Sequence, residues 1–280
     1  LPRPAVLAAA PHGVSAALID TLLTRAEAAG SKPTVVDLSA DYRFADPAAY
    51  AAVYGHAHGA PARQRQFTCA VPEHLAEAAT PHVAHPGCFS TATLLATVPL
   101  LALGLIEPRV FVSAVTGSTG AGRKPSAGTH HPQRHSDLYS YNGLAHRHAP
   151  EIAALARAAT GVEADIAFIP HSGPFARGIH ATVQATLLRP MRSGEVIAGL
   201  RQFYAGSHFV RVLDTPPRVK DVAASNYAEI SAVADGRTVA VMSVIDNLVK
   251  GAAGGGVQWM NRLLGFAETD GLTAPAPGWT

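Results

Sequence analysis

The chain has 280 residues, of which 48% are hydrophobic and 15% are charged, and its formal net charge is +2. This composition is typical of a globular protein with a substantial buried core and excludes an intrinsically disordered chain. The scattered charges give no reason to expect nucleic acid or a membrane surface as a partner, and no apolar run is long enough to span a bilayer. Two cysteines are too few for a disulfide framework, so we expect a cytoplasmic protein.

The first predicted elements are a strand at 5–10, a helix at 13–29 and a second buried strand at 33–38. Strand, helix and strand in this order predict a parallel α/β sheet. No Gly-x-Gly-x-x-Gly turn follows any of these early strands. Either the protein binds no dinucleotide, or the part that carries this turn is lost. Residues 41–74 are predicted to form loops and short helix over the sheet edge.

Cys88 has the most informative surroundings in the chain. An apolar run at 81–84 leads into Pro86-Gly87, the thiol, and a long apolar stretch of helix formers. This pattern predicts a cysteine in the first turn of a helix, where unpaired N–H groups and the helix dipole favour a thiolate. Such a thiolate is a candidate nucleophile, and the same N–H groups can hold the oxyanion of an attacked carbonyl. The alternative is a small buried residue that opens a core helix.

A strand predicted at 109–115 runs into a glycine-rich segment at 116–125. Alternate glycines, hydroxyls and the cations Arg123 and Lys124 form a backbone able to approach an anion closely. The segment lacks the spacing of a P-loop, so a flexible surface loop is the alternative. Its place directly after a buried strand favours anion binding.

Histidines are concentrated at 130–135 and 146–148, and three interpretations of them remain open. His146 or His148 is expected at a helix start, as acid or base toward Cys88, with Glu151 orienting or charging the imidazole. A metal site would need three or four converging ligands, and no His-Glu-x-x-His motif occurs. Solvated loop histidines are the third interpretation.

The remaining predicted elements are strands at 163–170, 178–188, 226–233 and 238–245, a helix at 193–206 and a last helix that ends at 264. The turn between the first two strands presents Arg177, either a ligand for a carboxylate or phosphate or a surface arginine. The small residues after Asn247 leave room for a flat group, or for another backbone segment, to approach closely.

Six motifs, in this order along the chain, resemble the N-acetyl-gamma-glutamyl-phosphate reductases. They are Pro11-His12-Gly13-Val14, Asp37-Leu38-Ser39-Ala40-Asp41-Tyr42-Arg43, His85-Pro86-Gly87-Cys88, Gly120-Ala121-Gly122-Arg123-Lys124, His146-Arg147-His148-Ala149-Pro150-Glu151-Ile152 and Ile245-Asp246-Asn247-Leu248-Val249-Lys250-Gly251-Ala252-Ala253-Gly254. The resemblance spans nearly the whole chain. This family shares its chemistry and two-domain plan with aspartate-semialdehyde and glyceraldehyde-phosphate dehydrogenases. Its members begin with a strand and a glycine-rich turn, so we expect this chain to lack about two βα units of the dinucleotide domain.

The resemblance implies NADPH-dependent reduction of an acyl phosphate, N-acetyl-glutamyl 5-phosphate, to its semialdehyde in arginine biosynthesis. Cys88 would attack the carbonyl, expel phosphate and form a thioester that NADPH reduces, with His146 in proton transfer and Glu151 as its partner. The implied substrate-binding residues are Ser118, Arg123, Lys124 and Arg177. The residues implied to face the NADP cofactor are Pro11, Ser39, Gly120, Asn247 and Gly254. No metal is implied.

Two other functions remain as alternatives. The related reductase of lysine biosynthesis acts on an aminoadipyl phosphate held by a small acidic carrier protein, and it shares the cysteine and the His-Arg-His motif. A carrier-protein substrate would predict a basic rim around the site. The alternative from a different functional class is a Cys-His hydrolase or acyltransferase, or a non-catalytic fragment.

The expected fold is α/β, with a truncated Rossmann-type parallel sheet and an α+β domain with a mixed sheet. Residues 1–87 and 248–280 are expected to form the dinucleotide-binding domain, onto which the last helix returns. Residues 88–247 are expected to form the catalytic, substrate and oligomerisation domain. The resemblance implies a homodimer or homotetramer that acts on a small-molecule substrate.

Overall fold

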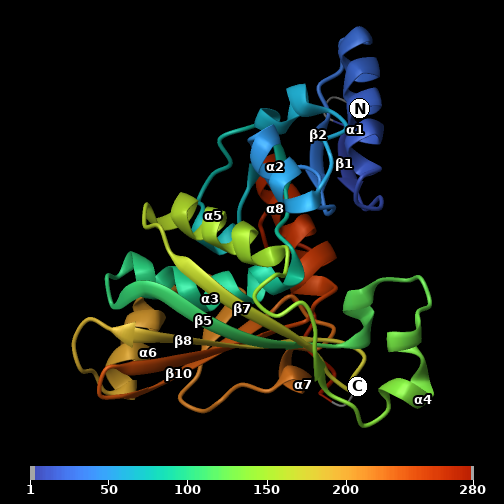
Figure 1. The fold of residues 1–280 in the computed structure, drawn as a ribbon. Helices are drawn as coiled ribbons and strands as arrows, with labels where there is room; N and C mark the ends of the chain where they lie inside the picture. Colours follow the sequence, from blue (N-terminus) through green and yellow to red (C-terminus); the bar gives the residue numbers. More distant parts are fainter. Residues whose placement is uncertain (1–3, 279–280) are drawn as a thin grey trace. The chain divides into compact units, whose positions relative to one another are not determined.

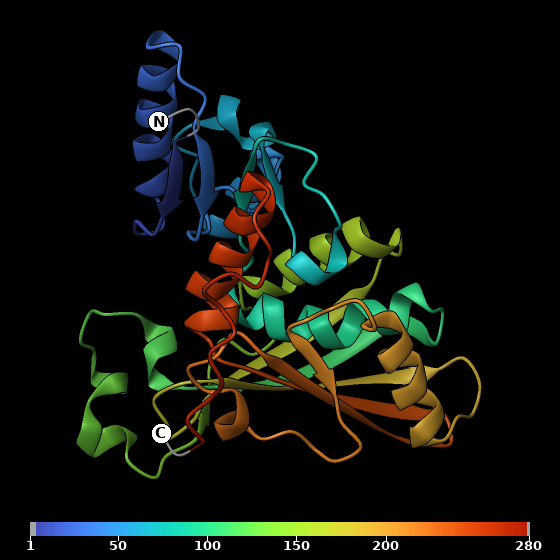
Figure 2. The same ribbon diagram turned by 180° about the vertical axis from the view of Figure 1, so that it is seen from behind.

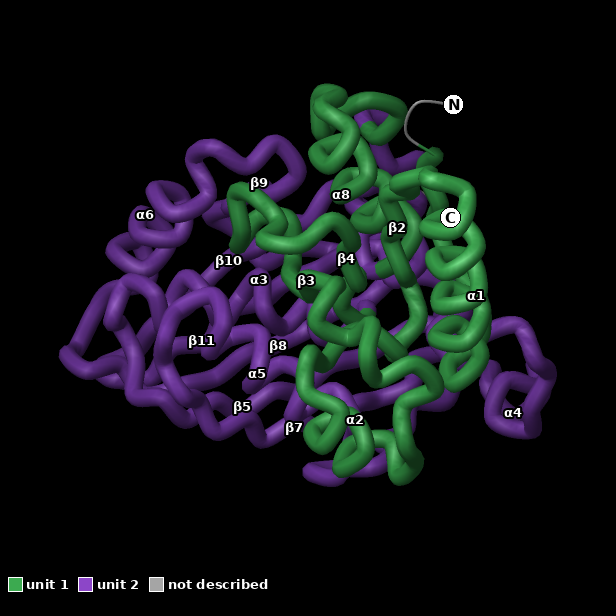
Figure 3. The backbone as a smooth tube through the Cα atoms, turned by 90° about the horizontal axis from the view of Figure 1, so that it is seen from above, with its two compact units in different colours: residues 1–87, 252–272 green, residues 88–251, 273–280 purple. Residues whose placement is uncertain are grey.

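The computed structural model describes residues 4–278, and the chain divides into two compact units (Figure 3). Unit 1 comprises residues 1–87 and 252–272, and unit 2 comprises residues 88–251 and 273–280. The segments 248–251 and 273–280 thus group with unit 2, whereas we expected them in the dinucleotide-binding domain. For 248–251 the reason is local, because the backbone N–H of Gly251 donates to the carbonyl of Asp246 at 2.9 Å.

Unit 1 is built around a parallel sheet of four strands in the order β1-β2-β4-β3. Its elements are β1 (Ala5–Ala8), α1 (Ser15–Ala28), β2 (Thr34–Asp37), α2 (Pro47–Tyr54), β3 (Phe67–Cys69), β4 (His82–Ala84) and α8 (Gly254–Leu264), with 3-10 turns at Pro61–Gln66 and Pro72–His74. The expected parallel α/β sheet is confirmed. The strand β3 was not expected, because three residues carry no periodic pattern that a sequence reveals.

The helix α8 packs on the sheet of unit 1. Its close approach requires a glycine at Gly256, since a Cβ there would lie 2.7 Å from the Leu38 side chain and 3.1 Å from that of Leu7. Trp259 is buried, and its indole N–H donates to the carbonyl of Ala70 at 2.8 Å. Small residues at the start of α8 therefore serve the packing of helix on sheet.

Two buried carboxylates join the loops at the carboxyl ends of β1 and β2. Asp41 accepts from the backbone N–H groups of Gly13 (2.8 Å) and Ala16 (2.9 Å). Asp37, whose pKa is raised by burial, accepts from the hydroxyls of Ser15 (2.7 Å) and Ser39 (2.6 Å). The first turn of α1 is therefore capped by a protein carboxylate, where a nucleotide-binding helix would offer its N–H groups to a phosphate.

Unit 2 is built around a mixed sheet of seven strands in the order β6-β7-β5-β8-β11-β10-β9. The strands are β5 (Ile106–Thr116), β6 (Tyr139–Ser140), β7 (Asp165–Ser172), β8 (Ile179–Leu187), β9 (Val210–Val212), β10 (Ala228–Asp235) and β11 (Thr238–Ile245). The pairs β5–β7 and β9–β10 are parallel, and the other pairs are antiparallel. The expected mixed sheet is confirmed.

Three helices lie on one face of this sheet (Figures 1 and 2). They are α3 (Cys88–Ala102), α5 (His148–Thr160) and α6 (Ser193–Phe203). Two short helices, α4 (His131–Arg134) and α7 (Val219–Val222), lie in the loops of the unit. The arrangement places the N-termini of α3 and α5, with Cys88 and His148, in the same unit as the glycine-rich segment.

The helix α3 is buried along almost its whole length. Pro99 lies inside it and lacks the N–H that would otherwise bond to the carbonyl of Leu95. The hydroxyl of Tyr204, directly after α6, donates to that carbonyl at 2.7 Å and so replaces the missing donor. None of the helices in the described part of the chain, α3 included, is long and apolar enough to cross a membrane.

The opposite face of the seven-stranded sheet carries exposed apolar side chains. Strand register places five residues in one row across five strands: Ala167, Phe111, Gln184, Ala240 and Val233. Phe111 and Val233 expose 48% and 49% of their surfaces. The row contains no charged residue, and Gln184 is its one polar member, so this face presents a largely apolar strip of the kind that protein interfaces use.

Candidate active site

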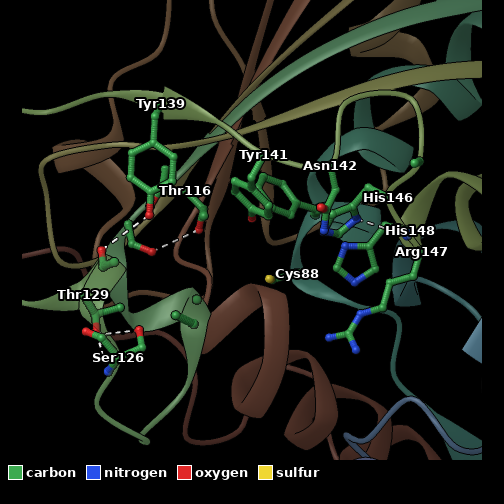
Figure 4. A pocket seen from close by; sticks show the side chains of 17 residues that line it. Cys88, Thr116, Ser126, Thr129, Tyr139, Tyr141, Asn142, His146, Arg147 and His148 are labelled. Carbon is green, nitrogen blue, oxygen red and sulfur yellow. Dashed lines mark hydrogen bonds between the residues drawn. The ribbon is translucent and has the colours of Figure 1, made fainter. Parts of the chain in front are cut away.

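A cavity of about 560 Å³ surrounds Cys88, and all of its lining residues belong to unit 2 (Figure 4). It is lined by Cys88, Phe89, Thr116, Gly117, Gly120, Ala121, Ser126, Gly128, Thr129, Tyr139, Tyr141, Asn142, Ala145, His146, Arg147, His148 and Ser172. Thr116 and Ser172 are register partners at the carboxyl ends of the parallel strands β5 and β7. The cavity therefore opens where parallel strands end, which is the usual place for a site in an α/β protein.

Cys88 is the first residue of α3 and is half-buried, so the predicted cysteine at a helix start is present. The strand β4 ends at Ala84, and residues 85–87 form the turn between strand and helix. The first N–H groups of a helix have no acceptor within it, and with the helix dipole they favour a thiolate and an oxyanion beside it. The position is therefore suited to a nucleophile.

Gly251 makes room for Cys88, a role that we did not predict. A Cβ on Gly251 would lie 2.7 Å from the Cβ of Cys88 and 3.0 Å from its Cα. Any larger residue would push the cysteine from the start of α3. The small residues after Asn247 had indicated close approach of a flat group or of a backbone, and at Gly251 the approaching group is Cys88.

His146 is buried beside the cysteine, with 8% of its surface exposed. Its ring lies 5.9 Å from that of Phe89 and 5.5 Å from that of Phe168, measured between ring centroids. The backbone N–H of His148 donates to Nδ1 of His146 at 3.2 Å, so the neutral ring carries its hydrogen on Nε2. Burial, and next the charge of Arg147, lower the pKa of His146 to about 4. At neutral pH it is an uncharged hydrogen-bond donor.

Replacing His146 with glutamine is expected to make the free energy of unfolding less sensitive to acid. Because the folded pKa is about 4 and the ordinary value is 6.5, the unfolded chain binds more protons between these values. Stability is therefore lost as the pH falls through this window, by about 2 kcal/mol between about pH 7 and about pH 5. Urea unfolding at the two pH values measures the difference between wild type and His146→Gln.

The control for this experiment is His131→Gln, because His131 is exposed in α4. We expect this variant to lose as much stability on acidification as the wild type. If His146→Gln also behaves as the wild type does, the low pKa assigned to His146 is wrong.

Glu151 lies in the first turn of α5 and is fully buried, but it does not line the cavity. Its charge raises the pKa of His146, against the larger opposite effects of burial and Arg147. His148 does line the cavity, with its ring 4.7 Å from that of His146. Among residues 4–278, no group of three or more His, Cys, Asp or Glu side chains is placed to hold a metal ion.

Tyr141 is a cavity residue that the sequence analysis missed. Its ring lies 5.7 Å from that of His146, and Figure 4 shows both of them grouped around the sulfur of Cys88. Burial, and next the neighbouring Cys88, raise the pKa of Tyr141 to about 12. The phenol therefore keeps its proton. A lone tyrosine in an irregular segment gives no sequence signal, so its position could not have been found without the fold.

The cations that we expected to bind substrate do not line this cavity. Arg123 and Lys124 are exposed in the glycine-rich segment, and Ser118 donates its backbone N–H to the carbonyl of Phe175 at 2.9 Å. Arg147, between the two histidines, is the one arginine or lysine among the lining residues. The His-Arg-His motif that contains His146 therefore also supplies the cation of the cavity. The sequence analysis did not assign this role to Arg147.

Arg177 faces a carboxylate of the protein itself. Its Nε donates to Oδ2 of Asp246 at 3.0 Å and its Nη2 to Oδ1 at 3.1 Å. Asp246 is fully buried, whereas Arg177 is partly exposed. The structure therefore does not bring Arg177 to the Cys88 cavity, because a two-point ion pair with Asp246 holds it elsewhere.

Two of the predicted cofactor residues belong to unit 2, and one of them lines the Cys88 cavity. Gly120 lines the cavity with an exposed backbone. The amide of Asn247 donates to the hydroxyl of the neighbouring Thr119 at 3.0 Å and accepts from the N–H of Gly178 at 2.7 Å. The amide therefore fixes the glycine-rich segment to the end of β11.

The other three predicted cofactor residues belong to unit 1. Pro11 and Ser39 follow β1 and β2, and their loops are joined by the N–H of Ala40, which donates to Nδ1 of His12 at 2.8 Å. Gly254 is the buried first residue of α8. Pro11 and Ser39 thus share the carboxyl edge of the parallel sheet, which is where such sheets bind ligands.

Residues 88–247, more than half of the chain, match the family described as "Semialdehyde dehydrogenase, dimerisation domain". Relatives named N-acetyl-gamma-glutamyl-phosphate reductase align over nearly the whole chain. The protein of Dehalococcoides mccartyi is 41% identical over 273 residues, which are 96% of this chain and 78% of the relative. Those of Methanopyrus kandleri and Pseudomonas fluorescens are 39% and 40% identical, with the same two shares.

Solved structures with the same fold are aspartate-semialdehyde dehydrogenases. Aspartate semialdehyde dehydrogenase II of Vibrio cholerae, in complex with ASA, has a TM-score of 0.68 at 16% identity, over 93% of this chain and 79% of that one. A probable aspartate-semialdehyde dehydrogenase from Pseudomonas aeruginosa has a TM-score of 0.62 at 19% identity, over the same shares.

Proposed function

The chain belongs to the N-acetyl-gamma-glutamyl-phosphate reductases, a family of oxidoreductases, and from this we propose that it reduces N-acetyl-glutamyl 5-phosphate to the semialdehyde, with release of phosphate, in arginine biosynthesis. The observation that carries the proposal is Cys88 at the N-terminus of α3, in a cavity that also holds His146 and Tyr141. A nucleophile, uncharged hydrogen-bond donors and a single cation suit an acyl phosphate substrate.

The proposed reaction begins with the thiolate of Cys88. Its sulfur attacks the acyl carbon, and the carbonyl electron pair moves to oxygen, beside the first N–H groups of α3. The oxyanion then collapses, the bond from carbon to the phosphate oxygen breaks, and phosphate leaves with that electron pair. The product on the enzyme is a thioester of Cys88. A thiolate stabilised by the first N–H groups of a helix is also a good leaving group in the later step.

Two neutral donors support this oxyanion in the proposed mechanism. His146 presents its Nε2–H, because Nδ1 accepts from the backbone, and its low pKa keeps it uncharged at neutral pH. Tyr141 keeps its phenol proton for the same use. Arg147 supplies the positive charge for a carboxylate or phosphate of the substrate.

The family implies a nicotinamide cofactor, and we propose NADP. Gly120 offers an exposed backbone without a side chain at the cavity, and Asn247 is fixed beside it, so the residues present fit a flat ring there. When bound, NADPH supplies the hydride that reduces the thioester. The N–H groups of α3 and the Nε2–H of His146 then hold the second oxyanion until the C–S bond breaks and releases the aldehyde.

An assay with two substrates tests this function. We expect phosphate-dependent NADP reduction with N-acetylglutamate 5-semialdehyde and no turnover of carrier-bound aminoadipate semialdehyde. The names of the relatives favour the small substrate, because they are N-acetyl-gamma-glutamyl-phosphate reductases. Hydrolysis of N-acetyl-glutamyl 5-phosphate to the free acid and phosphate, with NADPH present and not oxidised, would instead indicate the hydrolase alternative.

We also propose that two copies of the chain associate through the open face of the seven-stranded sheet. The apolar row that contains Phe111 and Val233 lies within residues 88–247, the segment that matches a dimerisation domain. A second copy would cover these exposed side chains by pairing one sheet face with the other.

Phe111→Glu is expected to convert the dimer to monomers, because it places a charge at the centre of an apolar interface. Light scattering coupled to gel filtration measures the mass. The control is Leu18→Glu, since Leu18 is 56% exposed and lies in α1 of unit 1, outside the seven-stranded sheet. Wild-type mass in the Phe111→Glu variant would show that the copies associate elsewhere.

A further inference from the structure

A second cavity in unit 2, of about 340 Å³, has an unusual charge. Three cations line it: Arg177, Arg218 and Lys220. No carboxylate is among its lining residues. Phe175, Val219 and the buried Ala223 give it an apolar floor. We refer to it below as the Arg218 cavity. It shares no lining residue with the Cys88 cavity.

Two of the three cations lack a balancing charge. Arg177 is paired with the buried Asp246, so its charge is neutralised within the protein. Arg218 and Lys220 are exposed, and neither forms an ion pair with any carboxylate among residues 4–278. Two positive charges thus converge on one hollow, where low-dielectric walls strengthen their attraction for an anion.

The guanidinium of Arg177 adds further donors to the wall of this cavity. Only its Nε and Nη2 donate to Asp246, and Nη1 remains for a ligand. Asp246 fixes the plane of the guanidinium at two points, so the donors that remain are held in one orientation. A preorganised fork beside two exposed cations is a suitable arrangement for a phosphate or carboxylate.

We propose that the Arg218 cavity binds a small dianion with an apolar body, that is, a phosphate monoester or a dicarboxylate. The two unbalanced charges of Arg218 and Lys220 set the charge of the ligand at about −2. The floor of Phe175, Val219 and Ala223 takes its apolar part. This proposal does not depend on the reductase function, because none of these residues lines the Cys88 cavity.

The walls of the two cavities are in contact with each other. A Cβ on Gly117, which lines the Cys88 cavity, would lie 2.4 Å from the carbonyl oxygen of Ala176, which lines the Arg218 cavity. The N–H of Thr119 donates to that same carbonyl at 3.1 Å. An anion in the Arg218 cavity therefore contacts the segment that supports the glycine-rich wall of the active site.

Isothermal titration calorimetry with phenyl phosphate and with phenylsuccinate tests the proposal. These probes share an aromatic ring and differ in whether the two charges are on a phosphate or on carboxylates. The test variant is Arg218→Gln with Lys220→Gln. The matched control is Arg157→Gln with Arg189→Gln, which removes the same charge from side chains of unit 2 that are 65% and 66% exposed. Inorganic phosphate serves as the probe without an apolar body.

We expect at least one of the two aromatic dianions to bind the wild type and the control alike, and the test variant about tenfold or more weakly. Binding at the Cys88 cavity is common to all three proteins, so the difference between them isolates the Arg218 cavity. Inorganic phosphate should bind the wild type more weakly than phenyl phosphate does. Equal affinities in the test and control variants, or no binding of either aromatic dianion to the wild type, would overturn the proposal.

Discussion

Cys88→Ser is expected to lower kcat for phosphate-dependent semialdehyde oxidation by about 1,000-fold or more, because the hydroxyl is a far weaker nucleophile than the thiolate. Serine is close to cysteine in volume and can also begin a helix, so α3 should form as before. The NADP assay measures kcat, and thermal unfolding checks the fold. Activity within about tenfold of the wild type would exclude the thioester mechanism.

Cys69→Ser is the matched control for this experiment. Cys69 is the other cysteine of the chain, half-buried at the end of β3 in unit 1. We expect it to leave kcat within about twofold of the wild type, since it lies outside the lining of the Cys88 cavity. Mass spectrometry after limited iodoacetamide treatment adds a readout that needs no cofactor. Cys88 should be alkylated before Cys69, because a helix N-terminus favours its thiolate.

Asp246→Asn is expected to lower the free energy of unfolding by about 3 kcal/mol. The buried carboxylate accepts from Arg177 at two points and from the backbone N–H groups of Ala224 (2.6 Å), Leu248 (2.8 Å) and Val249 (2.8 Å). An amide has one acceptor oxygen, and its N–H₂ would face donors that already point at it. Urea unfolding measures the loss.

Ala224 makes this loss smaller than the hydrogen bonds alone would, because its strain is released when the bond is lost. It has a φ of +62°, a left-handed conformation that costs about 1 kcal/mol for a residue with a Cβ. The bond from its N–H to Asp246 holds it there. Without the carboxylate, we expect the segment before β10 to relax.

Glu107→Gln is the control for Asp246→Asn. Glu107 also pairs with an arginine, Arg237, but the two side chains are 48% and 49% exposed. An exposed pair of this kind contributes about 0–1 kcal/mol. A similar loss of stability in the two variants would show that the burial of Asp246 does not matter.

The elements that the sequence predicted well are those held together by local interactions. The strand before Cys88, the turn at Pro86-Gly87 and the helix α3 follow from backbone preferences and apolar runs of neighbouring residues. The same holds for α1, β2 and the parallel sheet of unit 1. The β3 strand escaped prediction because its conformation depends on pairing with β4, not on its own three residues.

The site beyond Cys88 could be predicted only in part. The His-Arg-His motif indicated His146 and His148, which the cavity brings to the cysteine. The cation of the cavity could not be predicted, because no sequence feature distinguishes Arg147 from Arg123, Lys124 and Arg177. Which of them reaches the cavity depends on where the loops between strands are anchored, and only Arg147 does.

By itself, the sequence determined the fold class, the family and the position of Cys88 at the start of a helix, because each depends on residues close together along the chain or on motifs kept in order. Only the tertiary structure decided which side chains meet across the sheet. Arg177 pairs with Asp246 because the antiparallel register of β8 and β11 brings the start of one strand to the end of the other. Gly251 and Cys88 are also far apart in the sequence, and no local pattern encodes their close approach. Side-chain partners of this kind follow from strand order and register, which long-range packing sets.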